Sequence, residues 1–135
     1  MSFTNKEFKS FDNTPLTLYY WNCEQPKAVI HIIHGMSEHA ARYDHFASWL
    51  NNQGFIVIAS DLRGHGKTAG SLYDVGHFST TNGWKKVVKD VINISNKIKN
   101  ENPNIPLFML GHSMGSFILR SIAYTEPSIG NGYIF

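Results

Sequence analysis

Three short apolar segments constrain the fold of this chain more than any other feature. They occupy residues 28–33, 55–59 and 107–110, and His31 is the only polar residue among them. Segments of this length that are rich in β-branched residues and lack polar alternation are typical of strands buried on both faces of a parallel sheet. Helical patterns follow all three. Because alternating strands and helices imply parallel strands joined by right-handed crossovers, the sequence predicts an α/β fold.

The regions between these segments differ in character. Residues 43–52 form a helical pattern that Gly54 terminates. Residues 61–82 form a glycine- and polar-rich loop, and loops of that length inside a compact domain are usually functional or mobile. The helix that begins at Trp84 has an expected buried face made of Trp84, Val87, Val88, Val91, Ile92 and Ile98. Four charged residues fall mostly off that face, namely Lys85, Lys86, Lys89 and Asp90. We expect the lysines to form a solvated surface.

Both ends of the chain add strands to this pattern. Residues 7–11 and 16–21 flank a turn-rich spacer at 12–15, which predicts an antiparallel hairpin. A further helical pattern covers residues 113–124, and residues 132–135 have the character of one more strand. The length of 135 residues corresponds to one domain.

Composition excludes several classes of protein. With 12 Lys and Arg against 10 Asp and Glu the net charge is +2, so binding of nucleic acid through bulk charge is not expected. No apolar segment approaches the ~20 residues of a membrane-spanning helix, and the N-terminal residues do not resemble a signal peptide, which predicts a cytoplasmic protein without an integral membrane segment. Cys23 is the only cysteine, so no internal disulfide is expected. The histidines form no convincing ligand cluster, and we expect no metal and no other cofactor.

A G-x-S-x-G motif, Gly111-His112-Ser113-Met114-Gly115, lies between the third apolar segment and the helical pattern that follows. A serine hydroxyl is a poor nucleophile unless it is held clear of the backbone, and a tight strand-to-helix turn with flanking glycines does this. The first N–H groups of the helix then point toward the charge that develops in the transition state. We therefore predict Ser113 to be a nucleophile. The competing interpretation is a glycine-containing turn whose serine only caps the helix.

A second motif, His34-Gly35-Met36, follows the first apolar segment. A hydrolase of this architecture supplies its other oxyanion donor at this place. The backbone N–H groups of Met36 and Met114 are therefore predicted to converge on one carbonyl oxygen. We expect His34, Gly35 and His112 to contribute to substrate binding, with His34 as a packed, hydrogen-bonded residue and not as the catalytic base.

These motifs, together with Asp61-Leu62-Arg63-Gly64-His65-Gly66, resemble the monoacylglycerol lipase and lysophospholipase branch of the α/β-hydrolases. The resemblance runs from the first hairpin to the end of the chain. It implies the α/β-hydrolase fold and a serine hydrolase that cleaves carboxylic esters of small amphipathic lipids through an acyl-enzyme on Ser113. Transient contact with a membrane surface would be compatible with such substrates.

Five further residues match this family pattern outside the direct chemistry. Asp61 and Arg63 are expected to tie down the loop after the second apolar segment, and His65 is not expected to be a general base. Glu38 and His39, which match the family's H-G-x-x-E-H pattern, are expected to support the oxyanion loop.

The rest of a catalytic triad is not found in this sequence. In α/β-hydrolases the chain order is serine, then an acid, then histidine. After Ser113 there is one acidic residue, Glu126, at the far end of the next helix, and no histidine. We therefore expect residues 1–135 to be the N-terminal part of a single α/β-hydrolase domain. Alone, it should be inactive, and it should be prone to associate or need complementation by the missing C-terminal half.

Two alternatives stay open. An aminopeptidase-type α/β-hydrolase acting on peptide N-termini would carry the same motifs, because the G-x-S-x-G turn (the nucleophile elbow) and the oxyanion residues do not separate ester from amide cleavage. A non-enzymatic, hydrolase-like binding module would explain the missing histidine.

Overall fold

A computed structural model describes residues 2–135. It contains one sheet of six strands in the order β1-β2-β4-β3-β5-β6. The strands are β1 (Thr4–Lys9), β2 (Pro15–Trp21), β3 (Ala28–Ile33), β4 (Phe55–Ser60), β5 (Leu107–Gly111) and β6 (Gly132–Ile134). The pairs β1–β2 and β2–β4 are antiparallel, whereas β3 pairs in parallel with both β4 and β5, and β5 with β6. The predicted α/β fold with a mostly parallel sheet and an N-terminal hairpin is confirmed.

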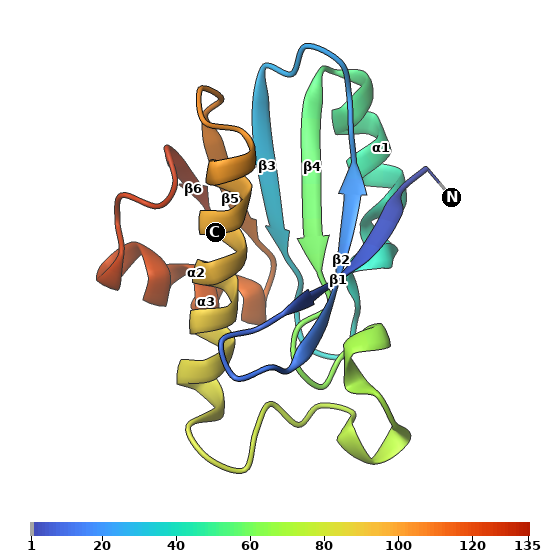
Figure 1. The fold of residues 1–135 in the computed structure, drawn as a ribbon, viewed down its shortest axis with the longest axis vertical. Coiled ribbons are helices and arrows are strands. Elements are labelled where there is room, and N and C mark those ends of the chain that lie inside the picture. Colours follow the sequence, from blue (N-terminus) through green and yellow to red (C-terminus); the bar gives the residue numbers. More distant parts are fainter. Residues whose placement is uncertain (1) are drawn as a thin grey trace.

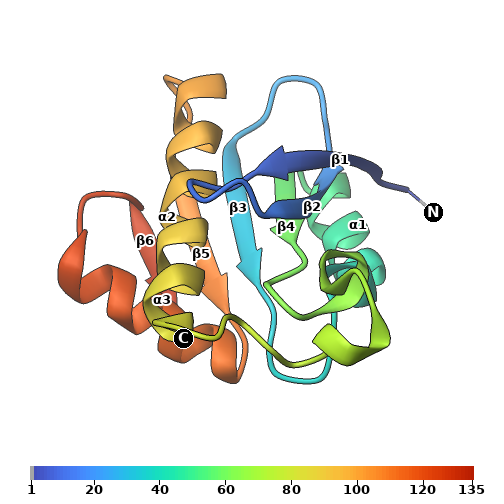
Figure 2. The same cartoon turned by 60° about the horizontal axis from the view of Figure 1, so that its bottom comes forward.

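Helices cover both faces of this sheet (Figures 1 and 2). They are α1 (Asp44–Asn52), α2 (Gly83–Glu101) and α3 (Met114–Thr125), with short 3₁₀ helices η1 (Ala40–Tyr43), η2 (Gly66–Ala69) and η3 (Leu72–Asp74). Helix α1 packs on one face, and α2 and α3 pack together on the other. Along β3, Ile30 and Ile32 face α1, while Val29 and Ile33 face α2 and α3. This burial on both faces is the reason why the segment lacks polar alternation.

Strand β1 begins three residues earlier than the apolar pattern predicts, at Thr4 in place of residue 7, and it ends at Lys9 in place of residue 11. Backbone pairing with β2 continues to Thr4 opposite Tyr20, although most β1 side chains are exposed. An edge strand is held by its ladder of hydrogen bonds, and such a ladder does not require the apolar alternation on which the prediction relied.

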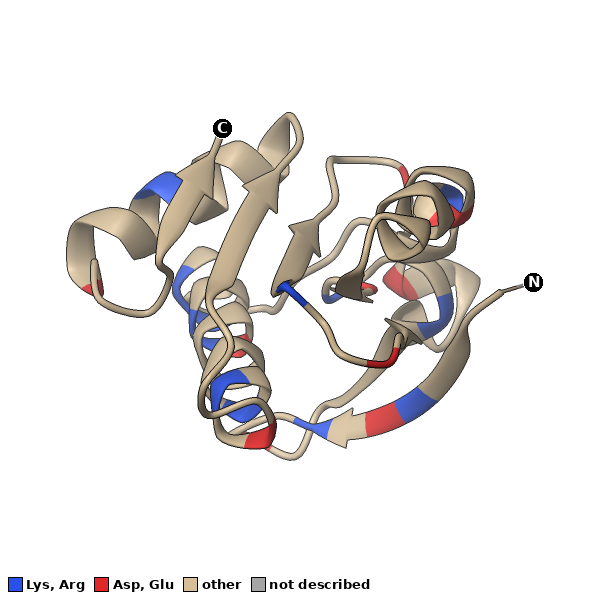
Figure 3. Ribbon diagram, turned by 90° about the horizontal axis from the view of Figure 1, so that it is seen from above, with Lys and Arg blue, Asp and Glu red and all other residues tan. Residues whose placement is uncertain are grey.

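Helix α2 departs from the prediction in the residues that it buries. Trp84, expected inside, is 41% exposed, while Asp90, expected off the buried face, is 2% exposed. The buried face consists of Val87, Asp90, Val91, Ile94, Ser95 and Ile98. The reason is tertiary, because Arg63 lies under the helix and pairs with the Asp90 carboxylate. The prediction of a solvated side is confirmed for the exposed Lys85 and Lys89, whereas Lys86 is half-buried and donates to the Ser79 hydroxyl. Figure 3 shows how the charged residues are distributed along the chain.

The 61–82 loop lies beyond the carboxyl end of β4, near the ends of β3 and β5 (Figures 1 and 2). In an open parallel sheet this edge is where ligands bind. None of the helices that the structure describes between residues 2 and 135 is long and apolar enough to cross a membrane.

Candidate active site

Ser113 lies in a strained turn between β5 and α3. Its backbone has φ 51° and ψ −118°, a conformation that residues with a β-carbon rarely adopt and that costs on the order of 1–3 kcal/mol. The residue is exposed. Within residues 2–135, the hydrogen bonds of Ser113 use its carbonyl oxygen, which accepts from the N–H and the hydroxyl of Ser116, and none uses its own hydroxyl. The turn therefore lifts a free hydroxyl out of the sheet.

The two glycines of the G-x-S-x-G motif are required by close packing of the backbone. A β-carbon at Gly115 would collide with the carbonyl oxygen of Ile33, and a β-carbon at Gly111 would collide with that of Gly115. No side-chain movement can relieve a collision with backbone. Glycine at position 115 allows the start of α3 to contact the end of β3, and glycine at position 111 allows the end of β5 to contact the start of α3.

The same contact brings together the two loops that carry the predicted oxyanion donors. Strands β3 and β5 are neighbours, and the His112 N–H donates to the Ile33 carbonyl at 3.0 Å. In the part of the chain that the structure describes, the backbone N–H groups of Met36 and Met114 donate to no protein acceptor. Met114 is the first residue of α3, so its N–H lies at the positive end of the helix dipole. Both groups are free to receive a negatively charged oxygen.

Glu38 joins these loops through one carboxylate oxygen. Its Oε1 accepts from the Gly35 N–H at 2.5 Å, from the Tyr43 hydroxyl at 2.8 Å and from His112 Nδ1 at 2.9 Å. Burial acts to raise the pKa of Glu38, but the hydrogen bonds from His112, Gly35 and Tyr43 outweigh it and hold the pKa below its usual value. Burial and the neighbouring carboxylate raise the pKa of Tyr43. The expected support of the oxyanion loop by Glu38 is confirmed, whereas the hydrogen bond recorded for the exposed His39 is local to η1, where its carbonyl accepts from the Arg42 N–H, so His39 does not show the expected support.

His34 and His112, the predicted binding histidines, have different surroundings. His34 is fully buried: its Nδ1–H donates to the Gly35 carbonyl at 2.7 Å, and its Nε2 accepts from the Leu62 N–H at 3.0 Å. Burial lowers its pKa, and both ring nitrogens are engaged in these hydrogen bonds, so the ring offers no free nitrogen to a ligand. It holds the oxyanion loop against the loop after β4. In contrast, the His112 side chain is 61% exposed beside Ser113.

Asp61 fixes the start of the 61–82 loop. Its Oδ1 accepts from the Ala40 N–H at 2.7 Å, and its Oδ2 accepts from the Tyr19 hydroxyl and the Lys67 N–H, each at 2.8 Å. A buried carboxylate with three donors of this kind ties η1, β2 and η2 to the end of β4.

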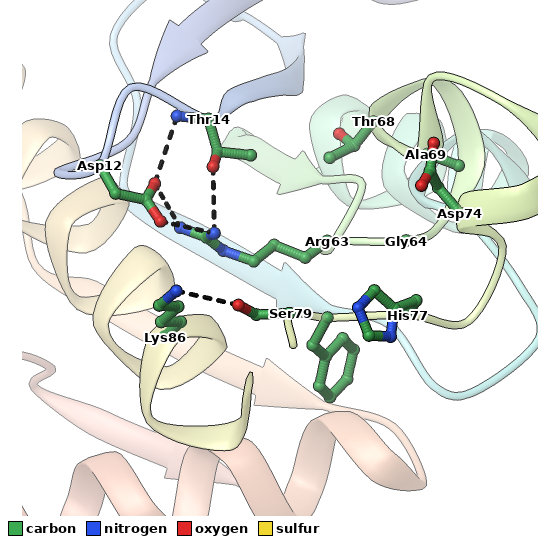
Figure 4. A pocket seen from close by; sticks show the side chains of 11 residues that line it. Asp12, Thr14, Arg63, Gly64, Thr68, Ala69, Asp74, His77, Ser79 and Lys86 are labelled. Carbon is green, nitrogen blue, oxygen red and sulfur yellow. Dashed lines mark hydrogen bonds and ion pairs between the residues drawn. The ribbon is translucent and has the colours of Figure 1, made fainter. Parts of the chain in front are cut away.

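Arg63 fixes the same loop from the other side, as Figure 4 shows beside a cavity of about 290 Å³. Its guanidinium donates to Asp90, Asp12, Thr14 and Ser10. The prediction that Asp61 and Arg63 tie down the loop is confirmed. Sequence reasoning missed Asp90, although its spacing from Val87, Val91 and Ile94 places it on the buried face of α2 and gave a usable signal.

A second cavity, of about 320 Å³, opens beside the predicted oxyanion donors. It is lined by Met36, Ser37, His65, Val75, Gly76, Phe78 and Met114. Four of these residues come from the 61–82 loop, so the Asp61 and Arg63 anchors also shape this cavity. Its lining is mostly apolar.

Glu126 lies far from the predicted nucleophile, as expected. It caps the C-terminus of α3, and twelve helical residues at about 1.5 Å each separate it from Ser113. Among the residues that the structure describes, no histidine ring bonds to the Ser113 hydroxyl, and no group of three or more His, Cys, Asp or Glu side chains could hold a metal ion.

Comparisons with known proteins agree with this geometry. Residues 24–135 match the family described as serine aminopeptidase, S33. The chain is 35% identical over 121 residues to the monoglyceride lipase homolog of monkeypox virus, covering 89% of this chain and 42% of the relative. It is also 35% identical over 124 residues to mouse monoglyceride lipase, with 91% and 39% covered. The chain thus spans about two fifths of the length of these relatives.

A solved structure shows the same architecture. A thermostable carboxyl esterase from Bacillus coagulans superposes with a TM-score of 0.87 at 31% identity, covering 98% of this chain and 43% of the esterase. The chain therefore belongs to the α/β-hydrolases, in the family described as serine aminopeptidase, S33, and in the branch that holds the monoglyceride lipases.

Proposed function

We propose that this chain is the nucleophile-bearing part of a serine hydrolase that cleaves carboxylic esters of small amphipathic lipids. The observation that carries the proposal is the backbone of Ser113, strained at φ 51° with a free hydroxyl, between a strand and a helix N-terminus. Strain of this kind persists only where the surrounding structure enforces it, and here the close approach of Gly115 to β3 does so.

In the proposed mechanism the Ser113 hydroxyl oxygen attacks the carbonyl carbon of the ester, and the carbonyl oxygen becomes an oxyanion. The Met36 and Met114 N–H groups bind that oxyanion, and loss of one such donor costs about 2.7–4 kcal/mol of transition-state stabilisation. The tetrahedral intermediate collapses to an acyl-enzyme as the alcohol leaves, and water then hydrolyses the acyl-enzyme.

The proposed mechanism also needs a base that accepts the serine proton and then passes it to the leaving alcohol. Among the described residues, no histidine ring forms a hydrogen bond with the Ser113 hydroxyl, so none is placed to act as that base. We therefore expect residues 1–135 to lack turnover by themselves, since losing a triad partner removes a factor of about 10⁴ or more.

The substrate class is inferred from the relatives. Two relatives at 35% identity are named monoglyceride lipase or its homolog, which favours lipid esters. The family description, serine aminopeptidase, favours a second candidate, cleavage of peptide N-termini. The elbow geometry suits both reactions, so a substrate panel must separate them.

A fluorophosphonate probe tests the nucleophile in the complete gene product that contains this chain. We expect the unmodified protein to be labelled and Ser113→Ala to be unlabelled. Ser121→Ala is the matched control, because Ser121 lies on the same helix and bonds to the Phe117 carbonyl. Labelling that survives Ser113→Ala would refute the assignment, and no labelling of the unmodified protein would favour a binding module.

The substrate class is tested by hydrolysis of monoacylglycerols, p-nitrophenyl esters and aminoacyl amides by the same protein. Turnover of the two ester classes with little turnover of the amides supports the proposal. The reverse preference would identify an aminopeptidase.

A further inference from the structure

The cavity beside the predicted oxyanion donors has one buried polar side chain in its wall. Met36, Val75, Phe78 and Met114 form most of the lining. His65 belongs to the same wall and is 5% exposed. An apolar cavity with a single buried polar group has the character of a ligand site, in which that group fixes orientation.

The His65 ring is held in one orientation. Its Nδ1 lies 2.8 Å from the Arg63 carbonyl oxygen, and because a carbonyl oxygen only accepts, Nδ1 carries the proton. The ring packs between His34 and Phe78, with centroids 5.2 Å and 5.9 Å away. Its backbone N–H donates to the Leu62 carbonyl at 2.9 Å. Arg63, whose guanidinium is itself fixed, thus sets the tautomer and the position of His65.

This arrangement leaves Nε2 of His65 as a hydrogen-bond acceptor without a partner. In the neutral ring, Nε2 has a lone pair when Nδ1 is protonated. Within residues 2–135, Nε2 of His31 is the one buried side-chain nitrogen or oxygen that lacks both a partner and contact with solvent. Nε2 of His65 also lacks a partner, so it is not sealed from solvent. Nε2 of His65 therefore keeps access to open space, and the ring lines the 320 Å³ cavity. A donor from outside the protein can reach it.

We propose that His65 Nε2 accepts a hydrogen bond from a hydroxyl group of the substrate and makes this cavity select hydroxylated esters. The inference rests on the proposed function, because the cavity borders the Met36 and Met114 donors. Once the ester carbonyl binds those donors, one arm of the substrate enters the cavity. The hydroxyl belongs either to the alcohol arm, as in a monoester of a polyol, or to a hydroxylated acyl arm. His65 is a specificity-determining residue in this proposal and takes no part in proton transfer.

Two substrate pairs with the same acyl length test the proposal in the complete gene product. The first compares octanoylglycerol with methyl octanoate, and the second compares methyl 3-hydroxyoctanoate with methyl octanoate. We expect a preference in kcat/KM of about 3- to 10-fold for the hydroxylated member of one pair, as one neutral hydrogen bond supplies. A preference in the first pair would place the recognised hydroxyl on the alcohol arm, and a preference in the second pair would place it on the acyl arm.

Variants of His65 separate recognition from folding. In His65→Asn the shorter amide can still donate to the Arg63 carbonyl but cannot reach the Nε2 position. We expect it to abolish the preference, so that kcat/KM for the hydroxylated ester falls about 3- to 10-fold more than kcat/KM for methyl octanoate. His65→Gln, which places an acceptor at the Nε2 position, should restore part of the preference. Phe78→Leu is the matched control, because it reshapes the same wall and should change all substrates alike.

A binding measurement makes the inference independent of turnover. Ser113→Ala protein should bind an octyl glyceryl ether or a 3-hydroxyoctyl methyl ether more tightly than octyl methyl ether, by about 3- to 10-fold, and His65→Asn should remove the difference. An unchanged preference in His65→Asn, or an equal loss on all substrates, overturns the inference. If the protein hydrolyses no ester but the binding difference is present, the proposed function fails and the His65 site stands.

Discussion

Replacing Arg63 by methionine tests the anchor on which the 61–82 loop depends. Methionine retains an unbranched side chain similar to the aliphatic stem of arginine, and it lacks the guanidinium. Asp90, whose side chain is 3% exposed, then loses its partners Nε at 2.5 Å and Nη2 at 2.9 Å and keeps the Ser10 hydroxyl. Removing one partner of a buried pair leaves an uncompensated charge, which costs about 3–5 kcal/mol. That is a large part of the about 5–15 kcal/mol by which domains are stable.

The ion pair between Arg63 and Asp12, which lies nearer the surface, should contribute less to the free energy of unfolding. Asp12 also pairs with Arg63, at 2.8 Å, but its side chain is 27% exposed. The Arg63 hydrogen bonds hold the pKa of Asp12 well below its usual range, and water screens part of that interaction. We expect Asp12→Asn to cost about 1 kcal/mol.

Urea unfolding followed by circular dichroism measures both changes in the complete gene product. The double variant Arg63→Met/Asp90→Leu, which removes both buried charges, should recover most of the loss caused by Arg63→Met, because apolar replacement of a buried pair is often neutral. Equal destabilisation by Arg63→Met and Asp12→Asn, or a double variant as unstable as the sum of its parts, would refute the reasoning.

Two further predictions concern His31 and Ser113. Burial lowers the pKa of His31 to about 4 in the folded chain, whereas the ring in the unfolded chain takes up a proton near pH 6.5. The free energy of unfolding should therefore be highest above pH 6.5 and should fall by about 3 kcal/mol as the pH drops to 4. His31→Leu should flatten this part of the stability profile in urea titrations at several pH values, and an unchanged slope would contradict the assignment. Ser113→Gly should be about 1 kcal/mol more stable than Ser113→Ala in thermal unfolding, because glycine tolerates φ 51° and alanine does not. Equal stabilities would show that this backbone is unstrained.

Much of the architecture could be predicted from local patterns. Strand β3 matches its apolar segment, and β4 and β5 each extend only one residue beyond theirs, because burial on both faces leaves an unbroken run of apolar residues. The elbow and the loop after β3 were likewise visible as short motifs, since the turn demands glycine at fixed positions.

Other features depend on partners that are distant in the sequence. Asp90 is buried because Arg63, 27 residues earlier, meets it beneath α2. Glu38 joins two loops through His112, 74 residues away. The helical spacing from Val87, Val91 and Ile94 places Asp90 on the buried face of α2, but a carboxylate on that face is stable only with a partner, and the local sequence does not contain Arg63.

The sequence by itself determined where the strands lie, where the elbow turns and which hydroxyl it presents, because these depend on residues within one strand or one turn. Only the tertiary structure decided that His34 is sealed while His65 keeps a free acceptor, and that a cavity lies beside Met36 and Met114. The physical reason is that hydrogen-bond partners and empty space are properties of segments meeting in three dimensions, and the same local sequence is compatible with either environment.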